Sequence, residues 1–169
     1  MKLLIMGYAK HGKDTASEYL RDKYSMNFVS SSMFCAEHVV YPVLKYKYAS
    51  ARECYDNRSS DRSTWFDLIT DYNTKDVSRL GREIFAAFDI YCGLRNKREF
   101  NALKNSGIFN YAIWIDRSPI VADESESSCT VKPWMADYVL DNTGTIDDLK
   151  RNVDVLMSTI HPQRLYEIL

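Results

Sequence analysis

A glycine-containing loop near the start of the chain carries the residues best suited to chemistry. Residues 7–13 read Gly-Tyr-Ala-Lys-His-Gly-Lys, which is the pattern GxxxxGK. Glycine at both ends lets backbone N–H groups converge on phosphate oxygens, and a helix that begins after the second glycine adds the positive end of its dipole. The ammonium group of Lys13 can then reach the β- and γ-phosphates of a nucleotide. The pattern predicts a phosphate-binding loop whose binding residues include Gly7, Gly12 and Lys13.

Four further residues in and after this loop are candidates for the same site. Lys10 and His11 are candidate phosphate contacts, although solvent-exposed side chains are the favoured interpretation for both. Asp14 stands where the usual pattern has Ser or Thr, and Thr15 follows it. Because Mg²⁺ prefers oxygen ligands, Asp14 and Thr15 are the candidate metal ligands. The alternative is that both residues only stabilise a helix N-terminus.

Elements that could position the loop flank it on both sides. Residues 3–6 are a continuous apolar run, typical of a strand buried on both faces, and apolar spacing predicts a helix from Asp14 to Tyr24. Strands and helices then continue to alternate. We expect further strands at 27–30, 90–93, 109–115 and 137–140, and helices at 33–48, 51–55, 61–72, 76–88, 96–105 and 147–160. This order predicts an α/β fold with a five-stranded parallel sheet flanked by helices.

The composition fits one soluble domain. The chain has 169 residues, 46% of them hydrophobic, and its 22 Lys and Arg residues nearly balance 23 Asp and Glu residues. The net charge of -1 argues against non-specific binding to nucleic acid or to an anionic membrane. Four cysteines without a CxxC pair argue against a zinc site and are typical of a reducing compartment. Since no apolar run approaches the length of a membrane span, we expect a cytoplasmic protein without membrane association.

Four segments together resemble one family of enzymes. Gly12-Lys13-Asp14-Thr15 is similar to the GKDT form of the phosphate loop in phage deoxynucleoside monophosphate kinases and their P-loop relatives. Residues 90–99 resemble that family's strand with a DxR tail and a nearby Glu, residues 123–127 its acidic, serine-containing lid, and residues 136–145 its closing strand and N-x-G-T. The resemblance implies a P-loop nucleotide-kinase-like three-layer fold, ATP and Mg²⁺, a free deoxynucleoside monophosphate as acceptor, and the host cytoplasm as location.

The acceptor side departs from this family. Gly93 stands where the DxR pattern has Asp, and the family's Leu-Gln plus Gly-Thr element is missing from residues 76–88. A related group of phage P-loop kinases resembles the same outline and phosphorylates 5-hydroxymethyluracil already placed in DNA. A modified base in DNA is therefore the alternative acceptor. A nucleotide-binding module without catalysis is a further alternative, which Asp14 and Gly93 permit.

The resemblance also implies roles for three residues outside the loop. Arg95 follows the carboxyl end of a strand, where open α/β sheets place ligands, and would clamp the acceptor. Its alternative role is an ion pair with Glu99 at i+4 spacing. Arg117 follows another strand in the same topological position and would reach the ATP phosphates, or else pair with Asp116. Asn142 would border the adenine or cap the last helix.

Two segments are expected to complete the site within one domain of residues 1–169. Residues 31–75 are expected to form an acceptor-binding insertion and residues 116–133 a lid loop. Arginines between aromatic residues in the first segment could hold a phosphate and a base, or else form an amphipathic helical pair with an aromatic core. These residues are Arg52, Arg58, Arg62, Tyr55 and Trp65. A hydroxymethyl acceptor would also need a carboxylate as proton acceptor, for which the candidates are Glu37, Asp56 and Asp61.

Overall fold

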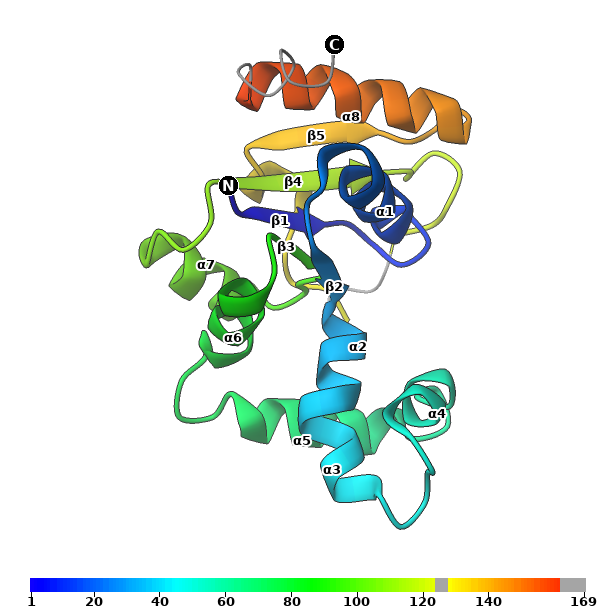
Figure 1. Ribbon diagram of the computed structural model, residues 1–169, viewed down its shortest axis with the longest axis vertical. Coiled ribbons are helices and arrows are strands. Elements are labelled where there is room, and N and C mark those ends of the chain that lie inside the picture. Colours follow the sequence, from blue (N-terminus) through cyan, green and yellow to red (C-terminus); the bar gives the residue numbers. More distant parts are fainter. Residues whose placement is uncertain (124–127, 162–169) are drawn as a thin grey trace.

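The computed structural model describes residues 1–123 and 128–161, and a single parallel sheet lies at its centre (Figure 1). The sheet consists of β1 (Leu3–Met6), β2 (Phe28–Ser30), β3 (Ile90–Cys92), β4 (Tyr111–Asp116) and β5 (Tyr138–Asp141). Their spatial order is β2-β3-β1-β4-β5, and every neighbouring pair is parallel. The expected five-stranded parallel sheet is confirmed.

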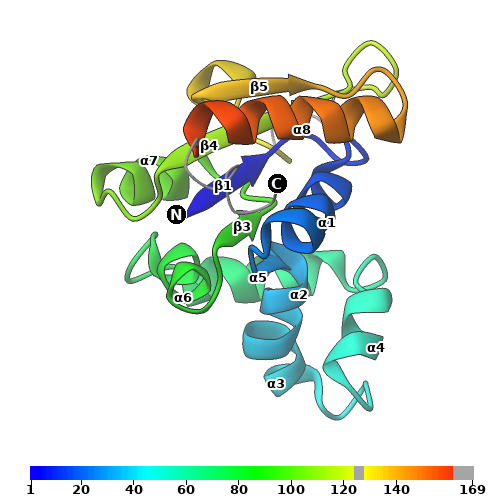
Figure 2. The same cartoon turned by 45° about the horizontal axis from the view of Figure 1, so that its top comes forward.

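Helices cover both faces of the sheet. They are α1 (Lys13–Tyr24), α6 (Arg79–Ala87), α7 (Lys97–Asn105) and α8 (Ile146–Ile160). Because successive side chains of a strand point to opposite faces, Leu3 and Ile5 share a core with α1 and α8, whereas Leu4 and Met6 share a core with α6 and α7. Figure 2 shows α1 and α8 on the same side of the sheet. The continuous apolar run of β1 thus follows from burial on both faces, and the predicted three-layer α/β fold is confirmed.

A helical arm extends from the edge strand β2, away from the sheet (Figure 1). It consists of α2 (Ser31–Cys35), a π-helical turn (Ala36–Val40), α3 (Tyr41–Leu44), α4 (Ala51–Asp56) and α5 (Arg62–Tyr72). The helix expected at 33–48 begins two residues earlier, because the Ser30 side chain accepts a hydrogen bond from the Met33 N–H and caps it. It ends at Leu44, and Pro42 lies in the first turn of α3.

The expected bounds of two more elements need correction. The strand expected at 109–115 begins at Tyr111, because the Phe109 ring packs against Phe85 and Phe100 with centroid distances of 6.2 and 6.0 Å. The helix expected from Asp76 begins at Arg79, because the Asp76 carboxylate accepts from the Ser78 N–H and hydroxyl and forms a turn.

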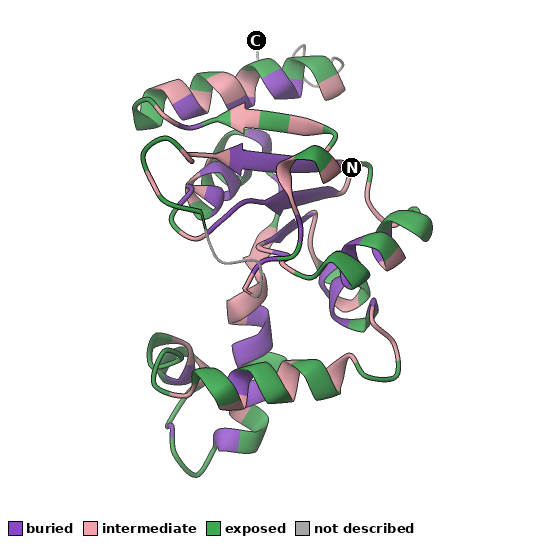
Figure 3. Cartoon of the chain, turned by 180° about the vertical axis from the view of Figure 1, so that it is seen from behind, coloured by how far each residue is buried: buried purple, intermediate pink, exposed green. Residues whose placement is uncertain are grey.

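Burial follows the layers. Figure 3 shows buried residues along the central strands and mostly exposed residues on the outer faces of the arm helices. Near β5, a short 3-10 helix (Pro133–Met135) precedes the strand. Within residues 1–123 and 128–161, no helix combines the length and the apolar character that a bilayer span requires.

Candidate functional site

The glycine loop joins β1 to α1, and its backbone requires both glycines. Gly7 and Gly12 have φ angles of 146° and 93°, in the region that disfavours other residues. A Cβ atom on Gly7 would lie 2.6 Å from the Ile115 carbonyl oxygen, and one on Gly12 would lie 2.3 Å from Nδ2 of Asn142. Both glycines are therefore fixed by a close approach of the loop to the ends of β4 and β5.

The conformation of the loop suits anion binding. Lys10 has a φ of 63°, so left-handed residues lie on both sides of His11, and the His11 N–H donates to the Tyr8 carbonyl at 3.3 Å, which closes a tight turn. Gly12 is the N-cap of α1 and has no side chain that could bond the N–H groups of the first turn. The positive end of a 12-residue helix thus points into the loop.

Lys13 and Asp14 lie at the first turn of α1 and face different parts of the site. Nζ of Lys13 bends back over the loop and donates to the Tyr8 carbonyl at 2.6 Å. The Asp14 carboxylate accepts from the Cys92 thiol, with 3.5 Å between Sγ and Oδ1. Burial, followed by the charge of Asp14, raises the pKa of Cys92 to about 12, so the thiol keeps its proton. Asp14 therefore connects the loop to the end of β3.

The expectation of a solvent-exposed His11 is wrong. Its ring is fully buried, and Nδ1 accepts from the Arg117 backbone N–H at 3.0 Å. Because Nδ1 accepts, Nε2 carries the proton of the neutral ring and donates to the Val121 carbonyl at 3.3 Å. The ring also makes an edge contact with Tyr8, 5.4 Å between centroids. His11 thus ties the loop to residues 117–121, whereas Lys10 is exposed as expected.

Asn142 supports the loop from the ends of β4 and β5. Its buried side chain donates from Nδ2 to the His11 carbonyl at 2.9 Å, and its backbone N–H donates to the Asp116 carbonyl at 2.7 Å. The N-cap of α8 is Thr145, in a capping box with Asp148. Asn142 therefore holds the glycine loop in place instead of capping α8.

Replacing His11 by alanine is expected to lower the free energy of unfolding by about 2 kcal/mol, because the change leaves the Arg117 N–H and the Val121 carbonyl without their partner in a buried site. Urea unfolding followed by circular dichroism measures this difference. Lys10→Ala in the same loop is the matched control and should change stability by less than about 0.5 kcal/mol. Equal effects of the two substitutions would contradict the assigned role of His11.

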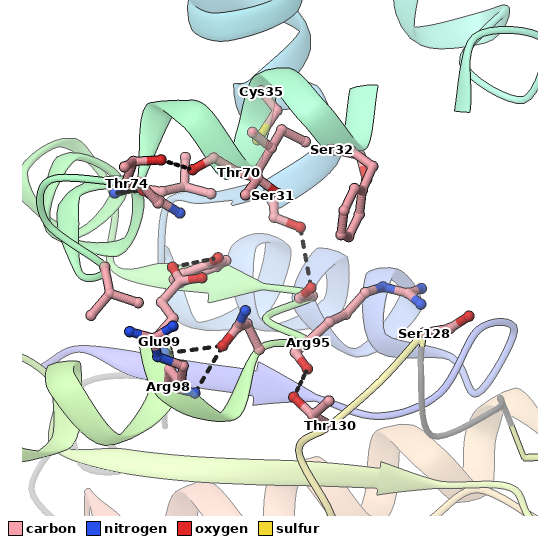
Figure 4. Close-up of a pocket in the computed structure, with 18 residues that line it drawn as sticks. Ser31, Ser32, Cys35, Thr70, Thr74, Arg95, Arg98, Glu99, Ser128 and Thr130 are labelled. Carbon is pink, nitrogen blue, oxygen red and sulfur yellow. Dashed lines mark hydrogen bonds between the residues drawn. The ribbon is translucent and has the colours of Figure 1, made fainter. Parts of the chain in front are cut away.

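A cavity of about 490 Å³ opens beside the carboxyl end of β3 (Figure 4). Its walls come from α2, α5, α6, the segment that links β3 to α7, the first turn of α7, and residues 128–130. Apolar side chains on one part of the wall include Ile69, Val77 and Leu80, and polar ones elsewhere include Ser31 and Arg95. A concave site with apolar walls and a few polar groups is typical of small-molecule binding.

Arg95 lines this cavity and is held there through its backbone. Its carbonyl accepts from the Thr130 N–H at 2.9 Å and from the Thr130 hydroxyl at 3.2 Å. In Figure 4 its side chain extends toward Ser128. The alternative ion pair with Glu99 is not formed between these two described residues, since the Glu99 carboxylate accepts from the Tyr91 hydroxyl at 3.0 Å. Arg95 therefore lines the cavity, and its role as an acceptor clamp stays a prediction.

Arg117 follows β4 beside the glycine loop. The alternative of an ion pair with Asp116 is wrong, because Asp116 accepts from the N–H and the hydroxyl of Ser118 at 3.0 and 2.6 Å. The Nε atom of Arg117 is buried and has no hydrogen-bond partner within the described part of the chain. Of the expected acidic lid at 123–127, residues 124–127 lie outside the described residues.

The arginines and aromatic residues of the arm form its structure instead of lining the cavity. Arg52 pairs with Asp56 at 3.2 Å, and the Arg58 guanidinium lies 4.1 Å from the centroid of the Tyr55 ring. The buried Trp65 belongs to the hydrophobic core. The helical-pair alternative therefore describes these residues better.

The three carboxylates expected as proton acceptors also lie outside the lining of the cavity. Asp61 binds Lys47 and the Tyr48 hydroxyl, and Glu37 is exposed beside His38. The cavity is lined instead by residues of α5 and its C-cap that follow the helical spacing i, i+3, i+4, i+7. They are Phe66, Ile69, Thr70 and Asn73. This spacing is the sequence signal that could have identified them.

No protein family and no curated protein matches the chain, whereas solved structures do. Shikimate kinase from Bacteroides thetaiotaomicron is 11% identical with a TM-score of 0.51, over 95% of this chain and 98% of that chain. TT1252 from Thermus thermophilus is 16% identical with a TM-score of 0.52, over 95% of this chain and 97% of that chain. At these identities the likeness shows the fold, which is the α/β fold of P-loop kinases. Membership of the phage deoxynucleoside monophosphate kinase family stays a prediction.

Proposed function

We propose that the chain is a kinase that transfers the γ-phosphate of ATP to a free deoxynucleoside monophosphate. One observation carries this proposal: the glycine loop and the cavity that Arg95 lines lie next to each other at the same edge of the sheet. Asp14, in the first turn of α1 directly after the loop, contacts Cys92 at the end of β3. Gly93, which follows Cys92, lines the cavity. A donor phosphate on the loop would therefore face an acceptor in the cavity.

The donor side has groups for a triphosphate. The loop amides, the N-terminus of α1 and Lys13 would bind the phosphates, and a nucleotide would take the place of the Tyr8 carbonyl at Nζ. Arg117 would add a further positive charge beside the loop. In this proposal Lys10 contributes its backbone, and His11 and Asn142 hold the loop.

Mg²⁺ fits the oxygen chemistry at the start of α1. Asp14 and Thr15 would hold it, directly or through water, and the phosphates would supply further oxygen ligands. When bound, the ion neutralises charge on the phosphates. The described residues contain no group of three or more His, Cys, Asp or Glu side chains that could hold a metal by themselves.

A phosphate acceptor requires little proton chemistry from the protein. An oxygen of the acceptor phosphate would attack the γ-phosphorus in line, and the bond from that phosphorus to the β,γ-bridging oxygen would break, with the electron pair leaving on ADP. A phosphate monoester is largely dianionic at pH 7, so the attacking oxygen carries no proton that a base must remove. Lys13 and Arg95 would offset the charges of the two phosphates. Asp56, Asp61 and Glu37 lie outside the cavity, so none of these three carboxylates would act as the base for a hydroxymethyl acceptor.

Two segments of the same domain would bind the two substrates, one the acceptor and the other the donor. Residues 31–75 would bind the acceptor, since Ser31, Ser32 and a face of α5 line the cavity. Residues 116–133 would cover the donor, since their first part is tied to the loop through His11.

Incubation with γ-labelled ATP and Mg²⁺ tests the proposal. The acceptors are the four deoxynucleoside monophosphates, DNA that contains 5-hydroxymethyluracil, and shikimate. We expect label in a deoxynucleoside diphosphate. Label only in DNA would assign the alternative acceptor, and label only in shikimate would reject nucleotide acceptors. ATP binding without transfer to any of the three classes would favour a non-catalytic nucleotide-binding module.

A further inference from the structure

The acceptor cavity contains a buried carboxyl group that the transfer of phosphate does not use. Glu99 lines the cavity although only 5% of it is exposed to solvent. Its position is fixed by the start of α7, where the Asn96 side chain accepts from the backbone N–H groups of Arg98 and Glu99. A carboxyl group so deeply buried is costly unless it has partners, and the Tyr91 hydroxyl is one of them.

The protein arranges Glu99 as a hydrogen-bond acceptor. The buried Tyr91 hydroxyl donates to Oε1 at 3.0 Å. Burial raises the pKa of Glu99 to about 7, and the hydrogen bonds from Tyr91 and the Gly81 backbone act in the opposite direction, toward the ionised carboxylate. A carboxylate has about four acceptor positions, so these donors leave room for a further one. A ligand in the cavity that carries an N–H group would supply it.

The other walls of the cavity suggest how such a ligand would lie. Ile69, Val77 and Leu80 offer apolar surface to the flat faces of a nucleobase. In Figure 4 the Arg95 side chain extends toward Ser128, away from Glu99. A nucleotide would therefore place its phosphate near Arg95 and its base near Glu99.

We infer that Glu99 recognises the base of the acceptor by accepting a hydrogen bond from it, and that it selects bases with a ring N–H group, namely thymine, uracil and guanine. This inference rests on the proposed function, since it takes a nucleotide as the occupant. Adenine and cytosine present an unprotonated ring nitrogen at the corresponding edge, and this nitrogen would repel a carboxylate. A hydrogen bond to a charged partner discriminates by roughly 10- to 100-fold.

Calorimetric binding of nucleotides at pH 8, where Glu99 is mostly ionised, tests the inference without any catalytic step. The probes are dTMP, dGMP, dCMP, dAMP and N3-methyl-dTMP, in which a methyl group replaces the ring N–H. We expect the wild type to bind dTMP and dGMP at least ~10-fold more tightly than the other three. In Glu99→Gln, which keeps the shape but not the charge, and in Glu99→Met, which removes the acceptor, this ratio should fall while ATP affinity stays unchanged.

Glu18→Gln, an exposed position on α1, is the matched control and should keep the wild-type ratio. Loss of the ratio in either Glu99 variant supports the inference, and a ratio retained in both folded variants overturns it. A wild type without preference for ring N–H bases overturns it too. Absence of nucleotide binding by the wild type would remove the proposed function as well, whereas the other outcomes leave it standing.

Discussion

Replacing Lys13 by methionine is expected to reduce phosphoryl transfer by about 1,000-fold or more, because the ammonium group that would stabilise the transferred phosphate is lost in a site shielded from water. Methionine retains much of the length and the apolar stem of lysine. The change removes the hydrogen bond from Nζ to the Tyr8 carbonyl, within the loop itself. We therefore expect a loss of stability of only about 1 kcal/mol.

Single-turnover transfer from labelled ATP and thermal unfolding measure these two effects separately. Lys10→Met is the matched control, because Lys10 lies in the same loop but its side chain is exposed. It should retain transfer within about threefold, since removal of an exposed charge has a small effect. Turnover near the wild-type rate in Lys13→Met would remove the glycine loop from the catalytic site.

The glycine loop was predictable because its whole pattern lies within seven consecutive residues, even though the atoms that approach its glycines belong to Ile115 and Asn142. The close approaches at Gly7 and Gly12 leave no space for a side chain, so the sequence must have glycine at both positions. The sheet was predictable for a similar reason, since strands buried on both faces must be apolar throughout. The central strands β1, β3 and β4 are such runs, and strands separated by helices admit few arrangements.

The contacts of His11 and Glu99 were not predictable in this way. Both depend on the spatial order of the strands, which brings residues 117–121 beside the loop and Tyr91 beside the first turn of α7. A histidine in a polar loop and a glutamate in a charged helix have the same local pattern as exposed residues. Their burial is a property of the assembled sheet.

The arm shows a third kind of limit. Its aromatic residues and arginines are typical both of a binding surface and of a small helical core, and composition alone does not separate the two. Helical spacing does not separate them along α5 either, because Ile69 lies one turn after the buried Trp65, packs against the same core and also lines the cavity.

Burial of Glu99 is expected to make the protein less stable as the pH rises from about 4 to about 8. Burial raises the pKa of this carboxyl group from 4.5 to about 7, against the opposing hydrogen bonds from Tyr91 and from the Gly81 backbone. Below pH 4.5 the group is protonated in both the folded and the unfolded state and contributes no difference. As the pH rises, the unfolded state ionises first, so the free energy of unfolding falls until the pH passes the pKa of the folded state.

A shift of this size corresponds to about 3 kcal/mol, since each pKa unit represents about 1.4 kcal/mol. Asp61 and Asp154 have pKa values that their partners lower, so their contribution has the opposite sign and acts in more acidic solution. Comparison with Glu99→Gln isolates the effect, because glutamine does not ionise and leaves the other groups in place. Urea unfolding at pH 4 and pH 8 should show wild-type stability, relative to this variant, falling by about 3 kcal/mol, whereas Glu18→Gln should follow the wild type. A constant difference between wild type and Glu99→Gln would mean that water reaches the Glu99 carboxylate in the folded protein, which would place it at an open part of the cavity instead of its buried wall.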